Sequence, residues 1–379
     1  MNLEVLIFPY CAGLITVVAY FFIMSVTNVI GMRLATSKPT IKSGPFVSVM
    51  VPARNEAANI EQCLERLLHQ DYANYEVLVI DDNSSDCTYC ILERIAAVDP
   101  RLQIFKGKPL NDDWYGKPFA LQQLAEHAKG DIFLFTDADT IHSPTSVSWA
   151  VTNIEHTKAD LISGFVGQIL KNFGERITVP IIFLLTGFVI PLFLNRFVRS
   201  GYFSAAVGQY IVIKRDVFIN TGGFEAIKKK TSEDIYMSRY IKECGYQTEF
   251  LDLSDQVFCR MYFGFTAAVQ GIGKNIYDFL GKNIFLLFFI VLLSLLFFLM
   301  PFPLLIWSIV TQNPMLHFII IINVLATLTW LVLFIARRIS WYNALLWPFM
   351  YCSLAYMILW SGFRTISKRG FSWKGRIVN

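Results

Sequence analysis

Charged residues are scarce in this sequence. Lys, Arg, Asp and Glu make up 16% of its 379 residues, whereas an ordinary soluble domain carries about 25%. No charge occurs between Val5 and Met32, and the stretch from Asn283 to Phe363 contains only Arg337 and Arg338. With hydrophobic residues at 54%, this composition excludes a disordered chain and argues against a wholly soluble globule.

Other features are absent as well. The net charge of +4 is too small to indicate a nucleic-acid partner. The seven cysteines include one CxxC, Cys87–Cys90, and no second CxxC or His pair completes a zinc site. We therefore expect Cys87 and Cys90 to be ordinary helix residues. No internal repeat or low-complexity tract is visible.

Long apolar runs lie at both ends of the chain. A bilayer core about 30 Å thick requires about 20 apolar residues of helix. Four runs meet this length: Val5–Met32, Ile284–Val310 with kinks expected at Pro301 and Pro303, Leu316–Ala336, and Tyr342–Trp360 with Pro348 in its middle. The sequence therefore predicts a multi-pass protein of the cell membrane.

The charges around the first run predict its orientation. No basic stretch precedes it and no small-residue cleavage site follows it, whereas Arg33, Lys38 and Lys42 come directly after it. Basic residues stay in the cytoplasm, so we expect an uncleaved anchor and a cytoplasmic polar domain. The predicted division is an anchor and linker over residues 1–43, the polar domain over 44–282, and helices with a basic tail over 283–379.

One uncharged apolar run, residues 177–195, lies inside the polar domain. A crossing there would place the two halves of one domain on opposite sides of the membrane. Pro180, Gly187 and Pro191 also disfavour a straight span. We expect an interfacial or buried segment.

The polar domain alternates β-rich apolar runs with helical patterns. Alternation of this kind predicts an α/β fold, with a mostly parallel sheet and helices on both faces. The expected strands are 47–51, 75–80, 102–105 and 132–135, and the expected helices are 59–70, a stretch reaching about 98, and 118–128. In such sheets ligands bind at the carboxyl ends of the strands.

Acidic pairs follow two of these strands: Asp81 with Asp82, and Asp137 with Asp139. Each pair is also compatible with a simple turn or helix cap. Two carboxylates one residue apart repel each other unless a cation lies between them. Oxygen ligands on a loop suit Mg²⁺ or Mn²⁺, which commonly share their coordination shell with substrate phosphates.

Six short motifs follow one another along the polar domain. They are Pro52-Ala-Arg-Asn-Glu56, Asp81-Asp-Asn-Ser-Ser-Asp86, Trp114-Tyr-Gly-Lys117, Asp137-Ala-Asp-Thr140, Gly222-Gly-Phe224 and Ser232-Glu-Asp234. In this order they resemble the family 2 glycosyltransferases with a GT-A fold, over roughly Val47 to Gly245. With the apolar tail, Cys259-Arg-Met-Tyr262 and Gly273-Lys-Asn275 look most like the diaponeurosporenoate (carotenoid-acid) glycosyltransferases and related hopanoid-associated members.

The resemblance implies roles for single residues. It makes Asp139 the direct metal ligand with Asp137 beside it or on the ribose, and Asp234 the general base with Glu233 as its competitor. It places the donor sugar nucleotide near Pro52, Arg54, Glu56, Asp81, Asp82, Lys117, Asp137, Arg260 and Lys274. Simpler alternatives remain open: Glu233 and Asp234 as charges at a helix N-terminus capped by Ser232, Lys117 as a solvated lysine, and Arg260 and Lys274 as membrane-surface charges.

The implied reaction is an inverting transfer of one sugar from a nucleotide-diphosphate sugar, usually a UDP-sugar in this family, to a membrane lipid hydroxyl or carboxyl. A carotenoid, a hopanoid or a glycerolipid would serve as the acceptor. Processive synthases carry Gln-x-x-Arg-Trp, whereas here Arg260 follows Gln256 one residue too late and Met261 replaces the tryptophan, which favours transfer of one sugar. The alternatives are a nucleotidyl- or phosphotransferase acting on a lipid, and a membrane transporter with a cytoplasmic domain.

Overall fold

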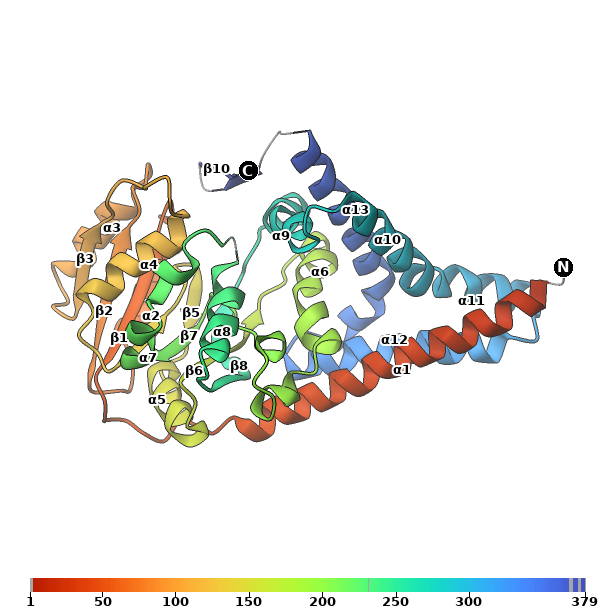
Figure 1. The fold of residues 1–379 in the computed structure, drawn as a ribbon, viewed down its shortest axis with the longest axis horizontal. Coiled ribbons are helices and arrows are strands. Elements are labelled where there is room, and N and C mark those ends of the chain that lie inside the picture. The colour runs from red at the N-terminus through yellow and green to blue at the C-terminus, as the bar shows by residue number, and fades with distance from the viewer. Residues whose placement is uncertain (1–2, 231, 368–370, 374–375, 379) are drawn as a thin grey trace. The chain divides into compact units, whose positions relative to one another are not determined.

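The computed structural model describes residues 3–230, 232–367, 371–373 and 376–378 (Figure 1). By its internal contacts the chain forms two compact units. The sheet unit comprises Ile30–Ile169 and Leu192–Arg260, and the apolar unit comprises Met1–Val29, Leu170–Pro191 and Met261–Asn379. Three residues of the predicted basic tail, Lys368, Arg369 and Lys374, lie outside the described residues.

The sheet unit is built on one eight-stranded sheet, ordered β3-β2-β1-β4-β7-β6-β8-β5. Every residue of β2 and β6 is buried, as expected for strands covered on both faces. The strands are β1 (Val47–Ala53), β2 (Tyr75–Asp81), β3 (Leu102–Lys106), β4 (Ile132–Phe135), β5 (Thr140–His142), β6 (Leu161–Gln168), β7 (Ile211–Lys214) and β8 (Thr248–Cys259).

The first four strands form a parallel region, as the sequence predicts. β1 pairs in parallel with β2 on one side and with β4 on the other, and β2 pairs in parallel with β3. β7 runs antiparallel to both β4 and β6, so the complete sheet is mixed. Because the strand order reverses at β1, the carboxyl ends of β1, β2 and β4 form the edge where α/β proteins bind ligands.

Helices pack on this sheet through apolar faces. α2 buries Ile60, Leu64, Leu67 and Leu68, which share one side of the helix. One core cluster includes Leu124 of α4, Met237 of α8 and Phe135 of β4. The helices are α2 (Ile60–Leu68), α3 (Thr88–Ala96), α4 (Gly116–His127), α5 (Ser146–Thr157), α7 (Arg215–Asn220) and α8 (Glu233–Glu243). The elements on either side of the carboxyl edge therefore share one core.

The apolar unit contains the long hydrophobic helices. Four segments are long and apolar enough to span a membrane: Ile7–Ala35, Ile284–Val310, Leu316–Ala336 and Trp341–Ile366. They comprise α1 (Leu3–Ala35), α10 (Ile284–Leu293), α11 (Pro301–Val310), α12 (Leu316–Ala336) and α13 (Trp347–Ile366), beside the shorter α6 (Phe173–Thr178) and α9 (Phe265–Phe279). A short antiparallel pair follows, β9 (Phe371–Trp373) with β10 (Arg376–Val378).

Prolines act differently at two places in these segments. In the segment Ile284–Val310, a π-helical turn over Ser294–Leu299 separates α10 from α11, and Pro301 opens α11 directly after this turn. Pro348, in the middle of the apolar run Tyr342–Trp360, does not interrupt α13. α13 begins at Trp347 and continues to Ile366, so Pro348 lies in its first turn, where a missing N–H costs nothing. Residues 177–195 fall into several short turns, including Val179–Ile182, Leu185–Val189 and Leu192–Arg196.

Candidate active site

Both acidic pairs lie at the carboxyl edge of the parallel strands. Asp81 ends β2 opposite Ala53 of β1, and the Asp82 N–H donates to the Ala53 carbonyl at 2.8 Å. Asp137 and Asp139 follow β4, the strand on the other side of β1. Local strand geometry therefore brings together carboxylates that are about 55 residues apart in sequence.

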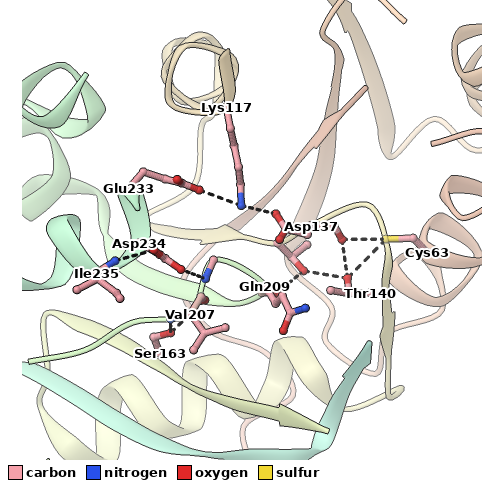
Figure 2. A network of polar contacts seen from close by, with 12 residues as sticks. Cys63, Lys117, Asp137, Thr140, Ser163, Val207, Gln209, Glu233, Asp234 and Ile235 are labelled. Atoms are coloured by element: carbon pink, nitrogen blue, oxygen red, sulfur yellow. Dashed lines mark hydrogen bonds and ion pairs between the residues drawn. The ribbon is translucent and has the colours of Figure 1, made fainter. Parts of the chain in front are cut away.

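Lys117 joins two carboxylates from different elements (Figure 2). Its Nζ lies 2.7 Å from Asp137 Oδ1 and 3.0 Å from Glu233 Oε1. Lys117 comes from the first turn of α4, and Glu233 is the first residue of α8. The lysine side chain is 33% exposed, so it lies at the rim of the site rather than in the core.

Asp234, the next residue of α8, is held by backbone donors. The Gly208 N–H donates to Asp234 Oδ2 at 2.9 Å, and the Ile235 N–H donates to Oδ1 at 2.8 Å. Gly208 also lies against Lys117, because a Cβ built on it would be 2.8 Å from Lys117 Nζ. The glycine therefore fits between the lysine and the aspartate.

The site carries an excess of negative charge, which shifts three pKa values. Burial lowers the pKa of Lys117, but Asp137 and Glu233 outweigh burial and hold that pKa well above its usual value. Burial, with the charge of Asp137, raises the pKa of Asp139 to about 7. Burial, with the charge of Glu233, raises the pKa of Asp234 to about 6. One lysine faces four carboxylates, so a further cation would stabilise the site.

The Asp137–Asp139 loop fits a divalent cation. Asp139 Oδ1 is buried and, within the described part of the chain, has no hydrogen-bond partner. Among those residues, no group of three or more His, Cys, Asp or Glu is arranged to hold a metal ion. The protein thus supplies at most two carboxylates here, which suits an ion that completes its shell with water and substrate phosphates.

Comparison with known proteins assigns part of the chain, most of it in the sheet unit, to a family. Residues 48–222 match the model described as Glycosyl transferase family 2. The chain contains a family 2 glycosyltransferase domain. Glycosyltransferase AglE of Haloferax volcanii is 34% identical over 132 residues, which are 34% of this chain and 42% of AglE. A beta-monoglucosyldiacylglycerol synthase of Trichormus variabilis is 35% identical over 129 residues, 31% of this chain and 27% of that protein.

The matches to these first curated relatives cover less than half of each relative's length. A longer match is the UDP-Glc:alpha-D-GlcNAc-diphosphoundecaprenol beta-1,3-glucosyltransferase WfgD of Escherichia coli, 27% identical over 62% of this chain and 96% of WfgD. The solved mannosyltransferase PcManGT from Pyrobaculum calidifontis, in complex with GDP-Man and Mn²⁺, has a TM-score of 0.54 at 18% identity, covering 95% of this chain and 99% of PcManGT. The predicted GT-A fold of the glycosyltransferase domain is thereby confirmed.

Three predicted donor residues of the glycosyltransferase domain lie in β1 or directly after it. Pro52 lies within β1, opposite Ile80. Arg54 Nη1 donates to the carbonyls of Asp82 and Asn83, so it supports the loop after β2. Glu56 is buried, its N–H donates to Thr88 Oγ1 at 2.8 Å, and its Oε2 accepts from the Asn59 side chain at 2.9 Å.

The two remaining predicted cations belong to different units. Arg260 directly follows β8 in the sheet unit, whereas Lys274 lies on α9 in the apolar unit.

Gln256, which begins the divergent Gln-to-Arg motif, accepts hydrogen bonds from Ser143 Oγ and Thr145 Oγ1 at 2.8 Å each. Gln256 therefore fastens the segment after β5.

Several residues of the site have no sequence signal of their own. Gly208 lies in an irregular stretch between apolar segments, and only the structure shows it between Lys117 and Asp234. Thr136 and His142 flank the Asp-x-Asp motif, but both are buried and neither belongs to the quoted motifs. The one sequence feature that points to them is the number of Ser and Thr residues around the Asp-x-Asp motif.

Proposed function

We propose that the chain transfers one sugar, with inversion, from a nucleotide-diphosphate sugar to a hydroxyl or carboxyl of a membrane lipid. The observation that carries the proposal is the carboxylate-rich edge of a family 2 glycosyltransferase domain, where Asp137, Asp139, Glu233 and Asp234 face one lysine. This edge combines a cation site with a candidate base.

Asp137 and Asp139 would hold Mg²⁺ or Mn²⁺ with the donor diphosphate. The ion supplies electrostatic stabilisation of the charge that gathers on the leaving nucleoside diphosphate. Lys117, already paired with Asp137, adds a compact positive charge at the same place. Asp81 and Asp82 lie on the same edge, where carboxylates accept hydrogen bonds from ribose hydroxyls or base N–H groups.

Asp234 is the better candidate for the general base. Glu233 is already engaged in an ion pair with Lys117 at 3.0 Å. Asp234 is oriented by two backbone N–H groups, and its raised pKa of about 6 lies closer to the operating pH, as an effective base requires. Asp234 takes the proton from the acceptor, whose oxygen attacks the anomeric carbon as the nucleoside diphosphate leaves. Each transfer forms one glycosidic bond and no covalent glycosyl-enzyme.

Two kinds of observation support a lipid acceptor. The chain has four segments able to span a membrane, more than anchoring alone requires. By their names, two relatives make a glucosyldiacylglycerol and act on a diphosphoundecaprenol-linked sugar. Carotenoid acids, hopanoids and glycerolipids all offer a hydroxyl or carboxyl at the interface. The positive charges that follow the first apolar run, Arg33, Lys38 and Lys42, support a cytoplasmic sheet unit. UDP-sugars are the first donors to test.

Mass spectrometry of lipid extracts tests this proposal. Cells that express the chain should contain a lipid heavier by one sugar, and cells that express Asp139→Ala at the same level should lack it. Identical lipid profiles in the two strains would contradict the proposal. Release of pyrophosphate rather than nucleoside diphosphate by the purified protein would instead indicate a nucleotidyltransferase.

A further inference from the structure

A buried polar cluster, consisting of Thr136, Thr140 and His142, lies behind the Asp-x-Asp loop. Thr136 directly precedes Asp137 and Thr140 directly follows Asp139, so the cluster brackets the loop at both ends. All three side chains are at most 2% exposed. None of them has a role in the reaction proposed above, and buried polar groups of this kind are retained only when they are well satisfied.

Close contacts join the cluster internally. His142 Nε2 lies 3.0 Å from the hydroxyls of both Thr136 and Thr140, and these hydroxyls are 3.1 Å apart. His142 Nδ1 lies 3.0 Å from Ser146 Oγ in the first turn of α5. Burial lowers the pKa of His142 to about 3, so the ring is neutral. The imidazole therefore ties the metal loop to a helix of the scaffold.

The two hydroxyls also reach backbone carbonyls, and Figure 2 shows Thr140 beside Asp137. Thr140 Oγ1 donates to the Asp137 carbonyl at 2.6 Å. Thr136 Oγ1 donates to the Gln209 carbonyl at 2.8 Å. Gln209 follows Gly208, whose N–H donates to Asp234. One cluster is thus bonded to the loop with the metal-binding carboxylates and to the segment that orients the base.

The hydroxyl hydrogens of Thr136 and Thr140 are used on backbone carbonyls, those of Gln209 and Asp137. A proton on His142 Nε2 then supplies the donor between the ring and the hydroxyl oxygens. The Ser146 hydroxyl, 3.0 Å from Nδ1, donates to Gln70 Oε1 at 2.9 Å. Removing either threonine hydroxyl takes one donor from a carbonyl and one of the two contacts from Nε2, which loosens the segment concerned.

We infer that Thr136, Thr140 and His142 are positioning residues that hold the metal loop and the base segment in one fixed arrangement. The inference rests on the proposed function, because it assigns the metal to Asp137 and Asp139 and the base to Asp234. Residues behind metal ligands typically change metal affinity or activity by about 10- to 100-fold when replaced. If these residues served folding alone, replacing them would lower the stability of the protein without weakening its affinity for the metal.

One experiment tests whether the cluster holds the metal loop. The purified chain is titrated with Mn²⁺ in the absence of any donor, and binding is followed by electron paramagnetic resonance. Thr140→Val should weaken Mn²⁺ binding by about tenfold or more, whereas Thr140→Ser, which keeps the hydroxyl, should bind as the wild type does. Thr221→Val is the matched control, since its buried hydroxyl donates to the Val217 carbonyl at 2.8 Å away from the cluster. Thr221→Val should melt at a lower temperature with unchanged Mn²⁺ affinity.

Steady-state kinetics of a separate variant tests whether the cluster holds the segment that orients the base. Thr136→Val should lower kcat about tenfold or more, with a smaller change in donor KM, and Thr136→Ser should restore kcat. Wild-type Mn²⁺ affinity in Thr140→Val together with wild-type kcat in Thr136→Val would overturn this inference and leave the proposed function standing. A wild-type protein that neither binds Mn²⁺ nor transfers sugar would overturn the proposed function, and this inference with it.

Discussion

Gly208→Ala is a small change that separates the geometry of the site from the stability of the fold. The added Cβ would lie 2.8 Å from Lys117 Nζ and 3.5 Å from Asp234 Oδ2. Ordinary contacts between nonbonded heavy atoms are about 3.5 Å or longer, so the lysine ammonium must move by roughly 0.7 Å. Gly208 has no positive φ, so the backbone accepts alanine. The atom that must move, Lys117 Nζ, is the end of a flexible side chain.

The expected loss follows from the ion pairs of Lys117. Lengthening the 2.7 Å contact with Asp137 to about 3.5 Å weakens it by about 1.4 kcal/mol at an effective dielectric constant of about 20. Because Lys117 is one third exposed, solvent reduces this figure. We therefore expect kcat to fall about three- to tenfold, with the free energy of unfolding unchanged or raised by up to about 1 kcal/mol.

Turnover and thermal unfolding of Gly208→Ala should be measured beside a matched substitution. Gly13→Ala in α1 is suitable, since no atom lies within 4 Å of its added Cβ, and it should leave kcat and the melting temperature near wild-type values. Wild-type turnover in Gly208→Ala would refute the placement of Lys117. A large drop in melting temperature would show that Gly208 is a folding residue instead.

Four further predictions concern the carboxylates and the membrane segments. Asp139→Ala should abolish transfer, even in saturating Mn²⁺, while the protein remains folded in the membrane; near-normal turnover would exclude Asp139 as a metal ligand. Asp234→Asn should lower kcat about a hundredfold or more at unchanged donor affinity, and the reverse pattern would move the base to Glu233. Because the base must be unprotonated, wild-type kcat should fall as the pH drops through about 6, the raised pKa of Asp234, and a flat profile there would count against it. If all four segments cross the membrane, Arg364 should be on the outer face, and protection from protease in sealed right-side-out vesicles would show that one segment does not cross.

The parallel half of the sheet and its acidic edge are predictable from sequence because both are local. β1, β2 and β4 are mostly apolar, and Asp81 and Asp137 stand at or just past a strand end. β5 and β7 contain three and four residues, too few for a period-two pattern to be distinguished from a loop. These short strands pair antiparallel with β8, β4 and β6, which the alternating pattern does not indicate.

The ion-pair network could not be derived from sequence patterns. Lys117, Asp137 and Glu233 lie on α4, the loop after β4, and α8, and only tertiary packing brings their charged atoms within 3.0 Å. Gly208 acts through its small size, which no sequence period reveals. Pro348 lies within an apolar run that hides the start of α13, and a proline there indicates a first turn as readily as a break.

The most direct test of the central claim is a paired measurement on one reaction. The purified chain in lipid vesicles receives a labelled sugar nucleotide and a total lipid extract, and both nucleoside diphosphate and organic-phase label are quantified with and without Mn²⁺. A metal-dependent transfer of one sugar should yield equal molar amounts of nucleoside diphosphate and singly glycosylated lipid, both lost when the metal is chelated. Label that appears only in water-soluble saccharide, or transfer that continues after chelation, would contradict it.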